Sequence, residues 1–177
     1  MVYILLTAIA ALIALVIVNT LRFTPRPLEP VTPEPVTVDQ EKVVRDMQDM
    51  IRCKTVSNRD EALTDFSQFS KFQALLAERF PRVHSAAALE HIGKTGLLYT
   101  LKGKSSEKPS VLMAHYDVVP ADEASWTKPP FEAILEDGVL WGRGTLDTKG
   151  TLLGVFEALE SLLAEGYQPE NDLYLVS

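Results

Sequence analysis

Cysteine is nearly absent from the 177-residue sequence, in which Cys53 is the single thiol. One cysteine excludes an intramolecular disulfide and also a zinc cluster built on thiolates. A lone cysteine is more often a small buried residue than a reactive nucleophile, so we expect Cys53 in the core. The chain therefore relies on neither disulfides nor thiolate clusters.

Basic residues are also few, because 24 aspartates and glutamates outnumber 17 lysines and arginines and give a net charge of −7. The sequence contains no basic stripe and no platform of aromatic and arginine residues, so we expect no nucleic-acid partner. A length of 177 residues suits one domain or part of a larger one.

Charge and proline are both absent from residues 2–18. A helix over this apolar run would be about 26 Å long, slightly less than the hydrocarbon core of a bilayer at about 30 Å. A cleaved signal peptide would carry a basic start and a small-x-small cleavage site, and neither is clear. We therefore predict a single-pass transmembrane signal anchor over residues 1–20, in preference to a signal peptide or a buried core helix.

Prolines come after the apolar run at positions 25, 27, 30, 33 and 35. Proline fixes φ and removes amide donors, so residues 21–38 are predicted to form a Pro-rich linker, an extended stalk beyond the membrane. Taken alone, Arg22 and Arg26 would favour a cytoplasmic side for the C-terminal part of the chain, by the positive-inside rule.

Residues 39–177 have the patterning of a globular domain. Apolar residues at helical spacing predict helices over 40–52, 63–79 and 148–165. Short apolar runs predict strands of one sheet at 97–101, 110–115, 131–135, 138–142 and 172–177. Strands that alternate with helices predict an α/β fold, a mixed sheet flanked by helices.

A histidine ends one of these predicted strands, in the run SVLMAHYDVVPAD that begins at residue 110. Open α/β sheets place their sites at the carboxyl ends of strands, where His115 lies. Because side chains alternate in an extended chain, Asp117 points the same way and can bind one imidazole nitrogen while the other faces a metal. Taken alone, the pair is also compatible with a purely structural histidine.

A second group of polar residues lies in GVLWGRGTLDTKG, residues 138–150. Asp147 precedes the predicted helix over 148–165, whose N-terminus would help to keep the carboxylate ionised as a metal ligand. A carboxylate has two oxygens, so it can bridge two cations. The alternative is that Asp147 only caps the helix and that Gly142 and Gly144 only form turns.

Together these motifs indicate a family. HYDVVP, WTKPPF and DGVLWGRGTLDTKG resemble the co-catalytic zinc metallopeptidases, the family of carboxypeptidase S, aminoacylase, acetylornithine deacetylase and succinyl-diaminopimelate desuccinylase. The resemblance covers about residues 40–177, and IRCKTVS at 51–57 is similar to a Thr-Val-Ser segment of these enzymes. The apolar N-terminus resembles the membrane-anchored carboxypeptidase S branch, which places the catalytic domain on the non-cytoplasmic side (periplasmic, lumenal or extracellular).

The resemblance implies a role for each candidate site residue. His115 becomes a ligand of one zinc, Asp147 the carboxylate that bridges two Zn²⁺ ions, and Asp117 the catalytic aspartate that orients His115. A hydroxide between the two metals would attack an amide carbonyl. Related enzymes hold the bridging aspartate on a cis bond, so the peptide bond between Asp147 and Thr148 is expected to be cis.

The resemblance also implies parts that this sequence does not contain. A Glu-Glu pair, further zinc ligands and a lid domain would follow Ser177, so residues 39–177 are expected to be a truncated catalytic domain, inactive alone. The expected function is zinc-dependent hydrolysis of amide bonds in short peptides or N-acyl amino acids. The alternative is a catalytically inactive, membrane-tethered binding or scaffolding protein.

Four other polar residues receive no catalytic role. His84 and His91 are interpreted as surface or structural residues because no carboxylate pattern accompanies them. Glu157 and Glu160 are expected on the solvated face of the long helix.

Overall fold

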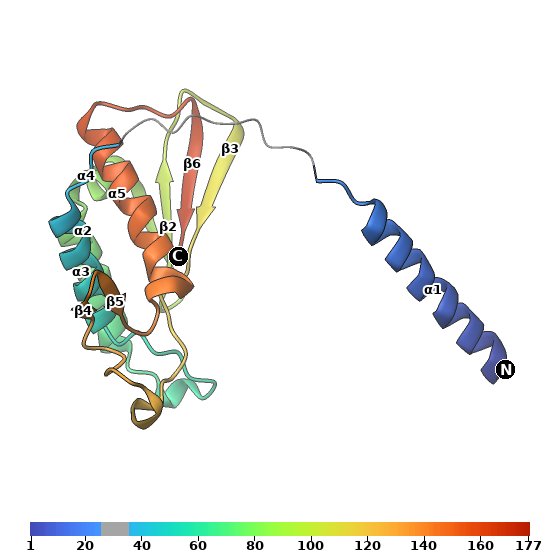
Figure 1. The fold of residues 1–177 in the computed structure, drawn as a ribbon. Coiled ribbons are helices and arrows are strands. Elements are labelled where there is room, and N and C mark those ends of the chain that lie inside the picture. The colour runs from blue at the N-terminus through green and yellow to red at the C-terminus, as the bar shows by residue number, and fades with distance from the viewer. Residues whose placement is uncertain (26–35) are drawn as a thin grey trace. The chain divides into compact units, whose positions relative to one another are not determined.

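The computed structural model describes residues 1–25 and 36–177. The chain divides into two compact units, Met1–Thr37 and Val38–Ser177, each of which is described by itself (Figure 1). Most of the predicted Pro-rich linker over residues 21–38, including the prolines at 27, 30, 33 and 35, lies outside the described residues.

The first unit contains helix α1, Val2–Arg22. Its 21 residues correspond to a length of about 31 Å, enough for the hydrocarbon core of a bilayer. None of its residues is buried, and Arg22 in the last turn is its first charged side chain. The length and composition of α1 therefore suit a membrane-spanning helix. A signal sequence would have the same length and composition.

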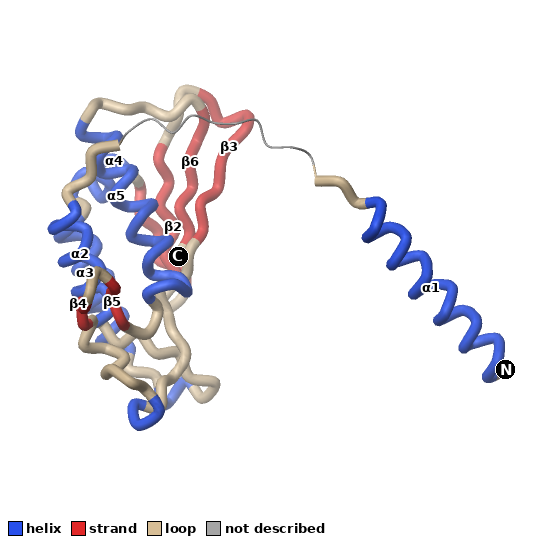
Figure 2. The backbone as a smooth tube through the Cα atoms, in the orientation of Figure 1, coloured by secondary structure: helices blue, strands red, loops and turns tan. Residues whose placement is uncertain are grey.

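The second unit contains the remaining helices and strands of Figures 1 and 2. Its α-helices are α2 (Gln40–Arg52), α3 (Phe66–Arg79), α4 (Pro81–Ala86) and α5 (Gly150–Ala164). Its strands are β1 (Ala88–Ile92), β2 (Gly96–Leu101), β3 (Ser105–Met113), β4 (Ile134–Glu136), β5 (Val139–Trp141) and β6 (Asn171–Val176). Shorter helical turns are η1 (Glu61–Leu63), η2 (Glu123–Ser125) and η3 (Thr145–Lys149).

Four strands form one mixed sheet in the order β1-β2-β6-β3. Strand β2 is antiparallel to both β1 and β6, whereas β3 runs parallel to β6. Helices cover the face that carries Leu97, Tyr99 and Leu175, which are at most 2% exposed (Figure 1). On the opposite face, Val111 and Met113 of β3 are 61% and 74% exposed. The predicted α/β fold with a mixed sheet and flanking helices is confirmed.

The prediction of a single sheet is wrong for residues 131–135 and 138–142. Strands β4 and β5 pair antiparallel with each other in a separate two-stranded sheet. Asp137 and Gly138 have φ angles of 51° and 77°, which favour a tight two-residue hairpin. The positive φ of Ala133, 53°, turns the chain immediately before β4 and shortens the predicted strand.

Two elements, α4 and β1, are missing from the sequence-based prediction. Helix α4 begins at Pro81, whose fixed φ suits the first helical position. Strand β1 is an edge strand in which only Leu89 is half-buried, so it lacks the apolar alternation that marks a strand. Strand β3 also starts before the predicted residue 110, with irregular pairing to β6 between Ser105 and Ser110.

The core beneath the sheet contains aromatic side chains of α3. Phe69 and Phe72 are at most 2% exposed, and Cys53 is 1% exposed, as expected for a small core residue. Helix α2 carries Met47, Met50 and Ile51 into the same core. Asp39 caps the N-terminus of α2, because its carboxylate accepts a hydrogen bond from the main-chain N–H of residue 42 at 3.0 Å.

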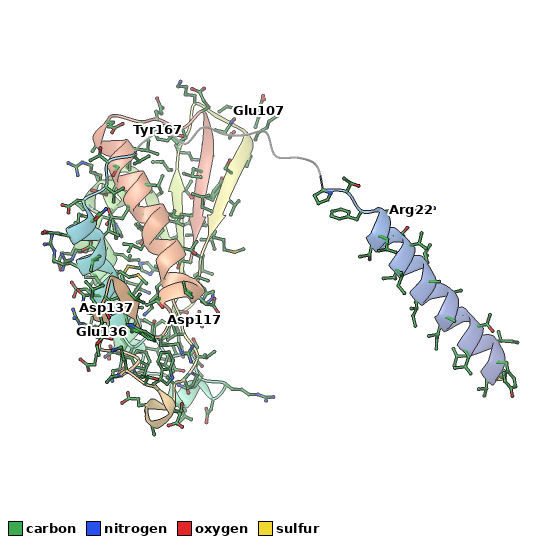
Figure 3. The ribbon with its side chains drawn as sticks, in the orientation of Figure 1. Arg22, Glu107, Asp117, Glu136, Asp137 and Tyr167 are labelled. Carbon is green, nitrogen blue, oxygen red and sulfur yellow. The ribbon has the colours of Figure 1, made fainter. Side chains whose placement is uncertain are left out.

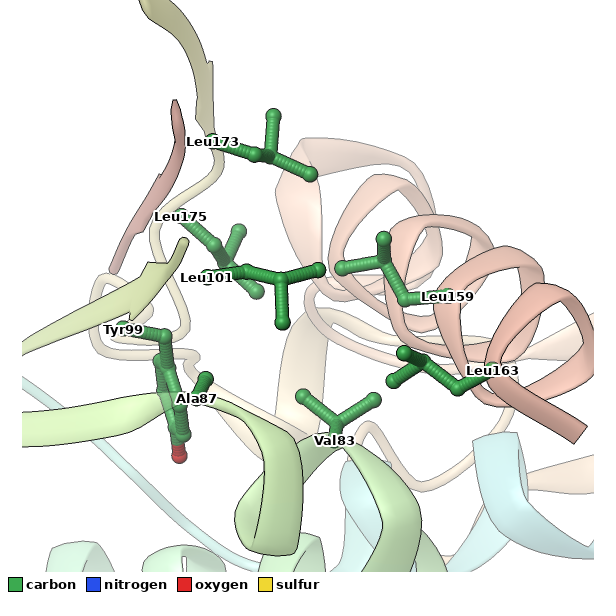
Figure 4. Close-up of a pocket in the computed structure, with 8 residues that line it drawn as sticks. All are labelled: Val83, Ala87, Tyr99, Leu101, Leu159, Leu163, Leu173 and Leu175. Atoms are coloured by element: carbon green, nitrogen blue, oxygen red, sulfur yellow. The ribbon is translucent and has the colours of Figure 1, made fainter. Parts of the chain in front are cut away.

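A small cavity of about 10 Å³ lies between the sheet and helices α4 and α5 (Figure 4). Its lining is formed by Val83, Ala87, Tyr99, Leu101, Leu159, Leu163, Leu173 and Leu175. Figure 4 shows the Tyr99 hydroxyl directed away from the leucines, and it hydrogen-bonds His84 Nε2 at 3.0 Å. A void of this size without polar partners is a packing defect, not a ligand site.

The expectation that Glu157 and Glu160 face solvent is wrong. Glu160 is 7% exposed, and its carboxylate accepts the main-chain N–H groups of Arg82 at 3.1 Å and Val83 at 3.0 Å. Helix α4 has no side-chain N-cap of its own, so Glu160 supplies one from α5. Glu157 accepts a hydrogen bond from Lys42 Nζ of α2 at 2.6 Å. Glu160 therefore links α5 to α4, and Glu157 links α5 to α2.

Replacing Glu160 with glutamine tests this tertiary cap. We expect Glu160→Gln to lower the free energy of unfolding by about 1–3 kcal/mol, because the amide NH₂ group would face main-chain donors. Chemical denaturation measures the loss. The matched control is Glu165→Gln, an exposed residue directly after α5, for which we expect a change within about 0.5 kcal/mol. Equal effects of the two substitutions would show that the cap contributes nothing.

Candidate metal centre

His115 lies just beyond the carboxyl end of β3, where the sequence places it. The main-chain N–H of Ala114 still bonds to the Val176 carbonyl at 3.1 Å, which extends the pairing with β6 to the residue before His115. Figure 3 shows Asp117 beyond the end of β3, on the side of the unit where α5 begins. The His115 side chain is 51% exposed, so it faces solvent and is not a filled core position.

Both ring nitrogens of His115 contact acidic residues. Nδ1 lies 3.0 Å from the main-chain oxygen of Asp117 and 3.1 Å from its carboxylate. Nε2 lies 3.0 Å from Oδ1 of Asp147. The predicted contact between the Asp117 carboxylate and one ring nitrogen is present, and the main-chain carbonyl of Asp117 contacts the same nitrogen. The structure thus brings His115, Asp117 and Asp147 together.

Asp147 lies in the single turn η3, which follows Gly144 with its φ of 89°. The peptide bond between Asp147 and Thr148 is cis, as the family resemblance implied. Helix α5 begins at Gly150, and its N-cap position is occupied by Lys149. Asp147 is therefore not the helix cap, and its side chain is 84% exposed. The hydroxyl of Thr148 donates to the His115 carbonyl at 2.8 Å and joins the two halves of the site.

The surroundings raise the pKa of His115 above its ordinary value. Partial burial is the largest single influence and lowers the pKa. The hydrogen bonds to the Asp117 carbonyl and the Asp147 carboxylate, together with the charges of both carboxylates, outweigh it. The two carboxylates therefore favour positive charge at this position, which a metal cation would also supply.

The donor set fits two ligands of a zinc ion. Imidazole nitrogen and carboxylate oxygen both bind zinc at about 2.0–2.2 Å, which places two ligands of a tetrahedral ion about 3.3 Å apart. The 3.0 Å between His115 Nε2 and Asp147 Oδ1 is close to that separation. Across residues 1–25 and 36–177, no group of three or more His, Cys, Asp or Glu residues could hold a metal. The pair is therefore a partial site.

The other histidines lie outside this site. His84 Nδ1 is 2.9 Å from the Phe80 carbonyl, to which it donates, and Nε2 accepts the Tyr99 hydroxyl at 3.0 Å. His91 is an exposed residue of edge strand β1. Both agree with the surface or structural interpretation.

Lys149 is a residue of the site region to which the sequence analysis gave no role. Its side chain is completely buried, and Nζ donates to the carbonyls of Met50 at 2.9 Å and Cys53 at 2.8 Å. Burial lowers its pKa to about 8, although the charges of Cys53 and Asp117 act in the opposite direction. Its place in the GRGTLDTKG motif, directly after the Asp147–Thr148 pair, is the signal that could have drawn attention to it.

Comparison with known proteins identifies the family to which the chain is related. Residues 111–177 match the model of Peptidase family M20/M25/M40. The chain belongs to this peptidase family. It is 33% identical over 175 residues to a Dictyostelium discoideum protein named probable carboxypeptidase S-like 2, covering 92% of this chain and 33% of that protein. It is also 33% identical over 159 residues to the N-fatty-acyl-amino acid synthase/hydrolase of Bos taurus, covering 88% of this chain and 31% of that protein.

Two solved structures share the fold. An M20 family metallo-carboxypeptidase from Sulfolobus solfataricus superposes with a TM-score of 0.61 at 20% identity, over 78% of this chain and 30% of that one. Human carnosine dipeptidase 1 gives a TM-score of 0.58 at 18% identity, over 77% and 31%. The chain thus spans about a third of the length of these curated relatives and solved structures.

The contact between Asp117 and His115 gives a first prediction for the M20-family site. We expect Asp117→Asn to weaken zinc binding by about 10-fold, at the low end of the usual 10–100-fold effect of removing a ligand's partner. The effect is small because the main-chain carbonyl of Asp117 still accepts from Nδ1. Competition with a chromophoric chelator measures the affinity of the full-length protein.

The control for Asp117→Asn is Asp137→Asn, which removes the same charge from the exposed β4–β5 turn. Asparagine also tolerates the positive φ at that turn position, so the fold is preserved. If the Asp117→Asn protein bound zinc as tightly as the control, the carboxylate of Asp117 would have no orienting role.

Proposed function

We propose that this protein acts in zinc-dependent hydrolysis of amide bonds in short peptides or N-acyl amino acids. The observation that carries the proposal is the 3.0 Å approach of His115 Nε2 and Asp147 Oδ1 in a chain of the M20 family. One relative is named as a carboxypeptidase S-like protein and another as an N-fatty-acyl-amino acid synthase/hydrolase. Both names imply action at an amide bond, so the proposal covers both substrates.

Each site residue has a separate task in this proposal. His115 would hold one Zn²⁺ through Nε2, and the Asp147 carboxylate, with its two oxygens, would hold that ion together with a second one. Asp117 accepts a hydrogen bond from the Nδ1–H group of His115. The proton then stays on Nδ1, and Nε2 is available to a metal. When bound, the ions polarise the amide carbonyl and make water a better nucleophile at neutral pH. The exposure of His115 and Asp147 leaves the site open to substrate.

A second candidate function is a catalytically inactive, membrane-tethered binding or scaffolding protein. Retention of all three site residues in contact supports the enzyme instead.

Removal of the imidazole tests the enzymatic proposal. We expect the full-length protein with His115→Ala to lose bound zinc and at least about 100-fold of its kcat/KM, because a metal ligand is lost. Metal content is measured by elemental analysis after dialysis. Turnover is measured with a panel of N-blocked dipeptides and a panel of N-acyl amino acids, which separates the two substrate classes.

His91→Ala is the matched control, because it removes an exposed imidazole from β1 without touching the site. We expect it to keep both zinc and turnover. A wild-type protein that binds zinc but cleaves neither panel would favour the scaffolding function. Zinc binding that survives His115→Ala would contradict the assignment of the ligand.

We also propose that α1 is a retained single-pass anchor and that Val38–Ser177 lies on the non-cytoplasmic side. The support is its 21-residue length and the absence of charge before Arg22. The non-cytoplasmic side rests on the resemblance to carboxypeptidase S.

Membrane extraction tests the anchor. We expect the full-length protein to stay in the membrane pellet after alkaline carbonate treatment, and a protein that lacks residues 2–22 to be released. Protease added from the non-cytoplasmic side should digest the second unit. A mature N-terminus that starts after Arg22, found by mass spectrometry, would show instead that α1 is a cleaved signal sequence.

A further inference from the structure

His115 and Asp147 lie in two distant segments of the chain. A third segment contacts residues close to each of them, Tyr116 on one side and Lys149 on the other. This third part is Cys53–Ser57, here called the 53–57 segment, which follows helix α2. It contains the Thr-Val-Ser residues that belong to the family resemblance. None of its residues contacts the His115–Asp147 pair through a described hydrogen bond.

The 53–57 segment runs parallel to the residues that follow His115, with Val56 paired to Val118. The buried hydroxyl of Thr55 donates to the Tyr116 carbonyl at 2.6 Å. The Thr55 carbonyl accepts from the N–H of Val118 at 2.8 Å, and the N–H of Ser57 donates to the Val118 carbonyl at 2.9 Å. These bonds enclose Asp117 and fix the chain on which His115 is carried.

The same segment is tied to the residues that follow Asp147 through Lys149. Nζ of Lys149 donates to the carbonyls of Cys53 and Met50, and the ammonium lies 5.0 Å from the centre of the Phe72 ring. The main-chain N–H of Lys149 donates to the Gly144 carbonyl at 3.0 Å, which closes turn η3. In the described part of the chain, no carboxylate forms an ion pair with Lys149.

A buried ammonium held by neutral carbonyls is a costly way to fill a core. An apolar side chain of similar volume would avoid the desolvation of the charge. The ammonium offers directed donors instead. Here they hold the carbonyl of Met50 in the last turn of α2, which has no partner within the helix, and the carbonyl of Cys53, the residue directly after the helix. Lysine at this position therefore fixes the direction of turn η3 relative to α2 and the 53–57 segment.

We propose that Thr55 and Lys149 are positioning residues, which through the 53–57 segment hold His115 and Asp147 at the separation that one metal ion requires. Thr55 acts on the His115 side and Lys149 acts on the Asp147 side. Neither residue touches the metal. The inference rests on the proposed function, because it takes His115 and Asp147 as ligands of zinc.

The decisive comparison uses Thr55→Val and Thr55→Ser in the full-length protein. Valine has nearly the shape of threonine but leaves the Tyr116 carbonyl without its hydroxyl donor, whereas serine keeps the donor. We expect Thr55→Val to weaken Zn²⁺ binding by about 10–100-fold, the range for loss of outer partners of a metal site. We expect Thr55→Ser to bind zinc as the wild type does.

A second readout is the visible absorption spectrum of the protein loaded with Co²⁺ alone, which reports the arrangement of the ligands. We expect Thr55→Val and Lys149→Met to change the intensity and position of the bands, and Thr55→Ser to leave them unchanged. If Lys149→Met does not fold, the Thr55 pair still decides. Thr55→Val with wild-type affinity and spectrum would overturn the proposal.

A destabilised control separates positioning from general loss of stability. Phe156→Leu weakens the core beneath the sheet, where Phe156 is 0% exposed and packs on Phe80 and Tyr99. We expect it to lower the melting temperature and to keep the zinc affinity and the Co²⁺ spectrum. An equal loss of zinc affinity in Phe156→Leu would show that Thr55 and Lys149 act only through stability. His115→Ala tests the ligand assignment separately, because zinc binding that survives it contradicts the proposed function and not the positioning.

Discussion

The crossover from β3 through α5 to β6 is the constraint on which the site depends. Parallel strands require a connection that carries the chain back to the starting edge, and α5 makes this return. The helix therefore runs against the strands and begins at the edge where β3 ends (Figure 1). His115 follows β3 and Asp147 precedes α5, so residues 32 positions apart meet at one edge of the sheet.

The side chains of the site and the groups that hold them lie in different environments. His115 and Asp147 have side chains that are 51% and 84% exposed, which would leave the proposed metal accessible to a substrate. Thr55 and Lys149, which bond to the neighbouring main chain, are completely buried. Exposed ligands on a buried, hydrogen-bonded support keep their geometry without loss of access. This arrangement explains how a partial site remains ordered on the open side of the fold.

The comparisons separate what the fold determines from what the local residues determine. Two solved structures keep the fold at 18% and 20% identity, because strand pairing and one-sided helix packing tolerate many side chains. A shared fold does not choose between a peptide and an N-acyl amino acid as substrate. Under the proposed function, that choice depends on groups around the scissile bond, and His115, Asp117 and Asp147 would serve either reaction.

Several features could be predicted from the sequence because their causes are local. The helix over residues 40–52 follows from its cap at Asp39 and its apolar spacing, and His115 and Asp117 follow from alternation along an extended chain. The motifs around Asp147 were enough to indicate the M20 family. Caps, periodicity and motif spacing act within a few residues, so the sequence displays them directly.

Only the tertiary structure decided the separate β4–β5 hairpin, the burial of Glu160 and the role of Lys149. The sequence shows a charged residue but not the partner that the folded chain brings to it. Glu160 is buried because it caps α4, which has no side-chain cap of its own. Lys149 is buried because the main-chain carbonyls of Met50 and Cys53 accept hydrogen bonds from its ammonium group. The sequence likewise does not show that β4 and β5 pair only with each other, apart from the four-stranded sheet. These outcomes depend on contacts between residues far apart in the chain, and such contacts leave no periodic signal in the sequence.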